Sequence, residues 1–125
     1  VVPMHELKAA GVTVMVSSDN TRDPFYAYGD LDLIEVLREA TRILHFDHSG
    51  PDWANTVART PADLMGLGSH GRIATGGPAD LILTRARSLT ELFSRPQSDR
   101  TVLVQGRAID TTLPDYAELD PLMSV

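Results

Sequence analysis

The amino-acid sequence predicts an α/β fold built from two regions of different character. A glycine-ended helical pattern runs straight into the apolar segment 12–16, and the periodicity of residues 30–44 is helical. After residue 67 glycines become frequent and the apolar runs are short, as in small β elements. We therefore expect a first region of one strand and several helices, residues 1–67, and a second region, residues 68–125, that contributes strands.

The first region opens with a helix followed by a strand. Residues 4–10 read as the last turns of a helix that ends at Gly11, and the apolar segment 12–16 reads as a buried strand. Helix and strand in this order form the second half of a βαβ unit, whose parallel strand needs a parallel neighbour. No second strand of that kind follows, so we expect the neighbouring strands to lie upstream.

Two helices are expected next. Residues 30–44 carry apolar side chains at helical spacing with charges between them, and Asp30 is placed to cap this helix. A shorter helix is expected over residues 51–58, because Pro51 suits a first turn.

A third helix is expected to begin at Thr60 as its cap and to end at Gly66 or Gly68. The large apolar side chains of these helices, Trp53 and Met65, are expected in the core.

The second region is predicted to be a small β element. The glycine-rich link 68–80 leads into a strand over 81–83, and a short helix over 88–93 separates it from a second strand over 101–105. The chain then turns at 106–107. These strands are too few to close on themselves, so we expect other strands to complete their sheet.

Composition excludes several classes of protein. The net charge is −6 and the 11 Lys and Arg residues are scattered, which argues against binding to nucleic acid. The chain has no cysteine, so any metal must be held by histidine and carboxylate. The longest apolar runs are far below the roughly 20 residues that span a membrane, and no signal-peptide pattern is present. We expect a cytoplasmic protein with no membrane partner.

The strongest candidate for chemistry is Asp19, at the carboxyl end of the predicted strand 12–16. Barrel and open-sheet enzymes carry their catalytic groups there, so Asp19 could bind a metal or move a proton, although an Asp after a strand can also form a turn or cap a helix. His45 and His48 have a spacing that could bind metal from one helix face, but a helix end with favourable charge explains them as well.

Two groups of residues resemble a known family. The first, in the second half of the chain, resembles the closing signature of the metal-dependent amidohydrolase superfamily. It comprises Thr60-Pro61-Ala62, Gly66-Leu67, Gly71-Arg72-Ile73, Gly76 and Pro78-Ala79-Asp80-Leu81-Ile82-Leu83. The second resembles, more narrowly, the loop after the eighth strand in the cytosine deaminase branch. It comprises Ser18-Asp19-Asn20, Asp23-Pro24-Phe25-Tyr26 and Gly29.

The resemblance implies a fold and a division of the chain. In this family the last helices of a (β/α)8 barrel of the TIM type lead back into a small β-sandwich. Residues 1–67 would be the last strand and helices of the barrel, and residues 68–125 would contribute strands to the accessory sandwich.

The resemblance also assigns residues. Asp19 matches the Asp that binds the divalent metal or its water and relays the proton to the leaving amine. Asn20 stands where a second Asp is common and would face the substrate, although it could also be a turn amide. Phe25 matches an aromatic that closes over the heterocycle, although it could also be a core residue. Arg22 and Asp23 could pair and hold the loop.

The implied function is a metal-dependent hydrolytic deaminase in which a metal-activated water attacks a cytosine-like amino-heterocycle and ammonia leaves. One divalent transition metal, zinc or iron, would be needed. The family that the chain resembles holds its metal with a His-x-His pair on the first strand and further histidines on the fifth and sixth strands. No His-x-His pair occurs in this chain, so the other ligands would lie outside it. Partners would be the small-molecule substrate and the remainder of the barrel upstream, and further copies of the chain could join it in a homo-oligomer. Alternatives are another amidase or lactam-ring hydrolase of the superfamily, and a non-catalytic C-terminal module that needs a partner chain.

Overall fold

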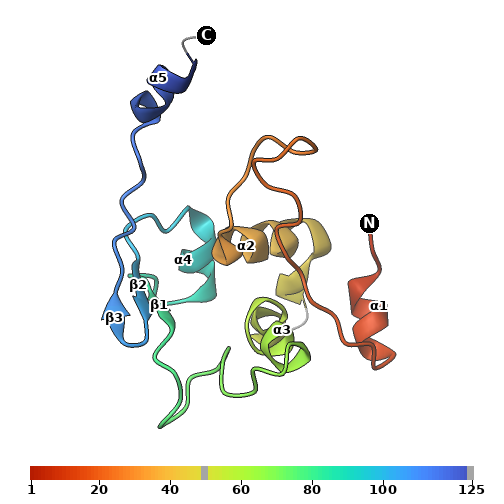
Figure 1. Cartoon of the computed structure of the whole chain (residues 1–125). Helices are drawn as coiled ribbons and strands as arrows, with labels where there is room; N and C mark the ends of the chain where they lie inside the picture. Colours follow the sequence, from red (N-terminus) through yellow and green to blue (C-terminus); the bar gives the residue numbers. More distant parts are fainter. Residues whose placement is uncertain (49–50, 124–125) are drawn as a thin grey trace.

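The computed structural model describes residues 1–48 and 51–123, and shows a helical part joined to a small antiparallel sheet (Figure 1). Gly50, expected near the start of the second helix, and residues 124–125 of the second region lie outside the described residues. The elements are α1 (Met4–Ala9), α2 (Leu33–Leu44), η1 (Phe46–His48), η2 (Pro51–Val57), α3 (Arg59–Leu64), β1 (Leu81–Leu83), α4 (Leu89–Ser94), β2 (Thr101–Val104), β3 (Arg107–Ala108), η3 (Tyr116–Leu119) and α5 (Asp120–Met123).

Helix α2 is the longest element and carries the centre of the helical part. It begins two residues later than predicted, because Asp32 rather than Asp30 is its cap: the Asp32 carboxylate accepts a hydrogen bond of 3.0 Å from the Ile34 amide. The Asp30 carboxylate instead accepts from the adjacent Leu31 amide at 2.8 Å. The helix ends at Leu44, because His45 turns into the left-handed region with φ of 57°.

The core is a compact aromatic cluster between α1, α2 and the 3-10 turns. The rings of Phe46 and Trp53 stack with centroids 4.0 Å apart, and Met4 and Leu37 are buried with them. The prediction of a core position is confirmed for Trp53, which is 3% exposed, and wrong for Met65, which is 66% exposed. Met65 is the C-cap of α3, where the chain leaves the helix away from this cluster.

Helix α1 is confirmed and is held to the core through His5. The His5 Nε2 lies 2.8 Å from the Leu44 carbonyl oxygen, and its ring meets Trp53 edge-on at 4.9 Å between centroids. Lys8 places its ammonium 4.4 Å from the centre of the Trp53 ring. Gly11 follows with φ of 81°, as a helix-ending glycine does.

The strand predicted over 12–16 is wrong for the described residues. Residues 13–16 keep the two-residue alternation of an extended chain, since Val14 and Val16 pack against the core while Thr13 and Met15 are exposed. A strand is defined by pairing, and here the Val16 amide reaches only the Thr56 carbonyl, at 3.3 Å. No strand of the described residues lies beside it.

The later helices are shorter and differently capped than predicted. Residues 51–57 form a 3-10 helix. Helix α3 begins at Arg59, and its N-cap, Ala58, makes no side-chain hydrogen bond, so the prediction of Thr60 as the cap is wrong. Gly66 follows α3 with φ of 73°, which confirms that a glycine ends this helix.

The predicted strands of the second region are confirmed. The sheet has the order β1-β2-β3 and is antiparallel throughout, with Leu81 opposite Leu103. Gln105 and Gly106, both with positive φ, form the two-residue turn between β2 and β3. The Asp80 carboxylate supports this turn by accepting from the Gln105 amide at 2.7 Å.

The residues that carry the superfamily signature have structural roles in the link between α3 and the sheet. Gly71 packs on the backbone of α3's N-terminus: a Cβ at this position would lie 2.4 Å from the Ala58 oxygen. Arg72 donates to the Gly68 carbonyl at 2.6 Å and pairs with Asp63. Gly71 and Arg72 of the signature therefore hold the segment that follows α3 against that helix.

One ion pair joins the two regions directly. Arg100, which precedes β2, donates from Nη1 to Asp32 Oδ1 at 2.8 Å and from Nη2 to Asp32 Oδ2, a two-pronged contact across 68 residues of sequence. Both side chains are about three-quarters buried. Asp32 thus caps α2 and anchors the sheet with the same carboxylate.

The molecule exposes a large apolar surface. Its accessible surface is 9658 Å², whereas a compact chain of this mass exposes about 6,600 Å². Large apolar side chains stand open on the extended segment, the sheet and the C-terminal residues; examples are Met15, Ile82, Leu83, Leu113 and Leu122. No helix among the described residues is long and apolar enough to cross a membrane.

We predict that the Asp32–Arg100 pair makes the free energy of unfolding fall as the pH is lowered into the acid range. The hydrogen bonds from Arg100 lower the pKa of Asp32 below its usual range, so the contribution of the pair is present above about pH 4 and is lost as pH falls through the folded pKa. In Asp32→Asn, which keeps a capping side chain, the free energy of unfolding at pH 7 should fall by about 1–3 kcal/mol.

Urea unfolding of both proteins at pH 7 and pH 3 checks this. The stability difference between wild type and Asp32→Asn should shrink at pH 3. Asp30→Asn, which alters an exposed pair with Arg22, is the matched control and should change stability by less than about 1 kcal/mol. An equal difference between wild type and Asp32→Asn at both pH values would contradict the assignment.

Candidate functional site

The site residues that the resemblance assigns, Asp19, Asn20 and Phe25, lie on one loop, residues 17–30, between the extended segment and α2 (Figure 1). Two of its residues other than glycine, Asp19 and Arg22, have positive φ, of 55° and 51°. Backbone hydrogen bonds close the outer part of the loop: the Arg22 amide donates to the Tyr28 carbonyl and the Asp23 amide to the Tyr26 carbonyl, both at 3.1 Å. The loop is therefore a folded structure.

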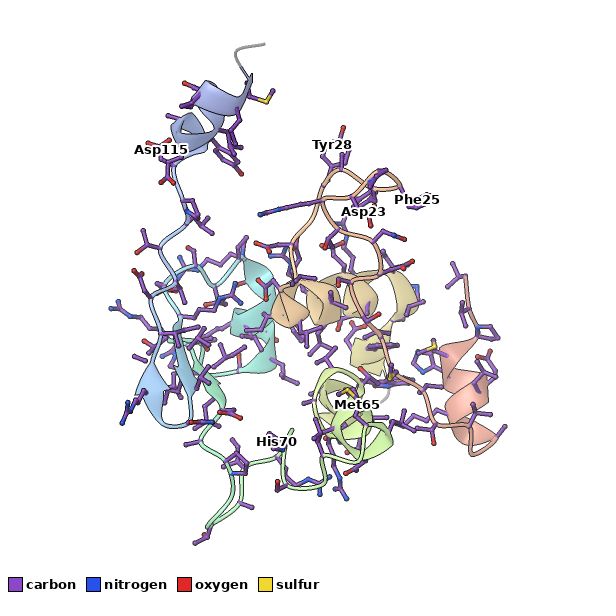
Figure 2. All side chains as sticks on the ribbon, viewed as in Figure 1. Asp23, Phe25, Tyr28, Met65, His70 and Asp115 are labelled. Carbon is purple, nitrogen blue, oxygen red and sulfur yellow. The ribbon has the colours of Figure 1, made fainter. Side chains whose placement is uncertain are left out.

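Asp23 organises the tip of the loop. Its Oδ1 accepts from the amides of Phe25 and Tyr26, both at 2.9 Å, and its Oδ2 accepts from Asn20 Nδ2 at 2.7 Å. The Asn20 hydrogen bond, followed by the one from the Tyr26 amide, lowers the pKa of Asp23 below its usual range. Asp23 thus remains an ionised anchor, and Figure 2 shows it beneath the turn that carries Phe25.

Arg22 ties the two arms of the loop together, although not through Asp23. Its Nε donates to the Gly29 carbonyl at 3.2 Å and its Nη2 lies 3.5 Å from Asp30 Oδ2. The predicted pair of Arg22 with Asp23 is therefore wrong, because the positive φ at Arg22 separates the two neighbouring side chains onto different partners. Both residues nevertheless stabilise the loop, Arg22 through Gly29 and Asp30, and Asp23 through the amides of the tip.

Asp19 is exposed and makes no hydrogen bond or ion pair with any other described residue. Its carboxylate is therefore available to an outside group such as a metal ion. Within residues 1–48 and 51–123 no three His, Cys, Asp or Glu side chains come together in a way that could hold a metal. A metal bound to Asp19 would need its other ligands from elsewhere.

The two histidines with metal-ligand spacing do not share a helix face. His45 is the left-handed cap that ends α2, and His48 belongs to the following 3-10 turn η1. The alternative explanation, a helix end, is the one that fits their positions.

The loop presents a set of exposed aromatic rings. Phe25 is 88% exposed, so the alternative of a core residue is wrong for it. Tyr26 and Tyr28 are 52% and 74% exposed, and their rings meet edge-on at 5.7 Å between centroids. Sequence reasoning singled out only Phe25. Three of the chain's seven aromatic residues fall within positions 25–28, and this clustering could have pointed to the other two rings.

The structure brings some of the predicted site residues together and leaves others apart. Asn20 is bonded to Asp23, while Asp19 and Phe25 stand exposed on the same loop. A cavity of about 420 Å³ lies between the loop and α2, lined in part by Thr21, Tyr26 and Glu35, but Asp19, Asn20 and Phe25 do not line it. Those three side chains project from a preformed loop, and other parts of a protein would have to complete a pocket around them.

Comparisons with known proteins identify the family. The sequence profile described as the amidohydrolase family matches residues 1–110. A pterin deaminase of Rhizobium rhizogenes is 60% identical over 120 residues, which are 96% of this chain and 28% of that protein.

Two crystal structures of 5-methylcytosine deaminase from Klebsiella pneumoniae, liganded with 5-fluorocytosine and with phosphonocytosine, match the fold. Each gives a TM-score of 0.68 at 25% identity; the match covers 93% and 92% of this chain, and 29% and 28% of those chains. The chain therefore spans less than a third of the length of these relatives.

The resemblance of residues 60–83 to the amidohydrolase superfamily is thereby confirmed, and the deaminase resemblance carried by residues 18–29 agrees with the relatives found. With the profile matching all but the last 15 residues, the chain belongs to the amidohydrolase family.

Proposed function

We propose that this chain is part of a longer, metal-dependent hydrolytic deaminase that acts on an amino-substituted heterocycle. The observation that carries the proposal is the 60% identity to a pterin deaminase over 96% of this chain, a span that includes the loop around Asp19. The excess of exposed apolar surface supports the presence of further protein around it. In that protein residues 1–67 would close a (β/α)8 barrel and residues 68–125 would add strands to a sandwich.

The substrate class follows from what pterin and cytosine have in common. Both carry an amino group on a ring carbon that is bonded to a ring nitrogen. Addition of water to that carbon and loss of ammonia leaves a ring carbonyl in place of the amine, so the reaction consumes one water and releases one ammonia. The pterin deaminase is much more similar in sequence than the cytosine-type neighbours, at 60% against 25% identity, so we favour a two-ring substrate of the pterin type over cytosine.

Asp19 is the residue of this chain that fits a metal. Its carboxylate is exposed and has no partner among the described residues, which is the state a metal ligand or proton acceptor requires. A divalent metal held there, zinc or iron, would supply activation of a water molecule near neutral pH. Asp19 would accept the proton from that water and pass it to the departing amine.

Asn20 and Phe25 would contact the substrate. The Asn20 Nδ2 is engaged by Asp23, so its amide oxygen is the atom that could accept a hydrogen bond from the ring or its amine. Phe25 stands open on the same turn and offers a flat apolar face on which a heterocycle can stack. Asp23 would keep both at a fixed distance from Asp19 by bonding the loop internally.

We predict that Asp19→Asn abolishes turnover in the complete enzyme. The substitution keeps the size of the side chain but removes the proton-accepting charge, so ammonia release should fall by about 100-fold or more. The folded state should survive, because Asp19 makes no contact that the fold needs. Ammonia release from pterin and cytosine, with metal content and circular dichroism on the same samples, is the measurement.

Asp30→Asn on the same loop is the control and should keep most of the activity. If Asp19→Asn released ammonia at close to the wild-type rate, Asp19 would be neither a ligand nor a proton carrier.

We predict that Phe25→Ala raises KM for ring substrates about tenfold, the size expected for loss of one stacking contact, with little change in kcat. Phe25→Tyr, which keeps the ring, should restore KM. Steady-state kinetics of all three proteins on one substrate would decide, and an unchanged KM in Phe25→Ala would remove this side chain from the substrate site. Unfolding is not a concern, because the ring is almost fully exposed.

A further inference from the structure

The C-terminal residues 110–123 leave β3 and rise along one side of the molecule to the level of the loop 17–30 (Figure 1). Nearly all of this segment is exposed, yet it has internal order: the Asp110 carboxylate accepts from the Thr112 amide and the Asp115 carboxylate from the Ala117 amide, both at 2.9 Å. The second of these bonds caps the turn η3. The segment is thus a short, shaped extension of the chain.

A cavity of about 530 Å³ lies between this segment and the loop. The loop contributes residues 22–23 and 27–29 to its lining, and the C-terminal segment contributes Tyr116 and Leu119. The lining residues of the loop include Arg22 and Gly29, which are joined by a hydrogen bond, and Tyr28, whose carbonyl accepts from the Arg22 amide. Two apolar side chains of the segment therefore face the part of the molecule that carries the proposed substrate contacts.

The extent of the sequence matches sets this segment apart. The general family profile ends at residue 110, where the segment begins. The alignment with the pterin deaminase covers 120 of the 125 residues, so it leaves out five at most and must run well into the segment. The structural matches with 5-methylcytosine deaminase cover 93% and 92% of this chain, so they also run into the segment. The extension therefore lies beyond the general family profile and is shared with deaminases of both kinds.

We propose that residues 110–123 form a strap whose Tyr116 and Leu119 support the outer arm of the loop and so position Phe25 and Asn20 over the substrate. Tyr116 and Leu119 are positioning residues, because they line the loop's side cavity and not the surface that carries Asp19. The placement of Tyr116 and Leu119 across a cavity from the loop stands on the geometry alone, whereas the effect on the substrate rests on the proposed function.

The test uses hydrogen exchange of the loop in the complete protein. Tyr116→Ala with Leu119→Ala removes both supporting side chains, and Leu122→Ala with Met123→Ala removes two equally exposed apolar side chains of the strap that do not line the cavity. Amide exchange in residues 19–30, read by mass spectrometry, should be about threefold faster in the first double variant and unchanged in the second. All four residues are at least half exposed, so folding should survive.

Kinetics provide the second readout. Release of the loop should raise KM for a pterin substrate severalfold and leave kcat nearly unchanged, because Asp19 lies at the start of the loop, outside the braced arm. Equal exchange of residues 19–30 in wild type and in the first double variant, or equal acceleration in both double variants, would overturn the strap. Loop exchange needs no catalysis, so a selective acceleration would uphold the strap even if the wild-type protein released no ammonia, a result that would instead overturn the proposed function.

Discussion

The carboxylate of Asp32 is the point on which the arrangement of this chain depends. It caps α2 through the Ile34 amide and holds both arms of the Arg100 guanidinium, which stands just before β2. The hydrogen bond from Ile34 starts the longest helix, and the contact with Arg100 holds the sheet against that helix.

The loop that carries Asp19 ends at this same anchor. Asp30 and Asp32 are two residues apart, so the arm that Arg22 holds through Gly29 and Asp30 runs directly into the capped start of α2. The other arm leans on the core through Val16. A loop fixed at both ends and bonded internally by Asp23 can present Asp19, Asn20 and Phe25 in a constant geometry, which is what a site completed by other protein segments requires.

The sequence predicted those elements whose ends are marked by local residue patterns. The strands at 81–83 and 101–104, the second predicted over 101–105, are marked by short apolar runs between turn residues, and they pair with each other within the described residues. The glycine that ends α3 was predicted as well. The segment 12–16 could not be settled in this way, because a strand exists only when a partner supplies its hydrogen bonds. Asp30 and Asp32 both suit a helix cap in the local pattern, and the contact of Asp32 with Arg100, 68 residues distant, is invisible to that pattern. In the candidate site, Asp19 was singled out by its position after the predicted strand and then by a resemblance, and Phe25 by the resemblance, whereas the role of Asp23 in the loop required coordinates.

A double-mutant cycle on Asp32 and Arg100 tests the account most directly. The free energy of unfolding would be measured at pH 7 for wild type, Asp32→Asn, Arg100→Gln and the double variant. A partly buried, two-pronged pair should give a coupling energy of about 1 kcal/mol or more, and the single variants should both loosen the sheet against α2. A coupling energy near zero would mean that the two regions are held by other contacts, and that this carboxylate is only a helix cap.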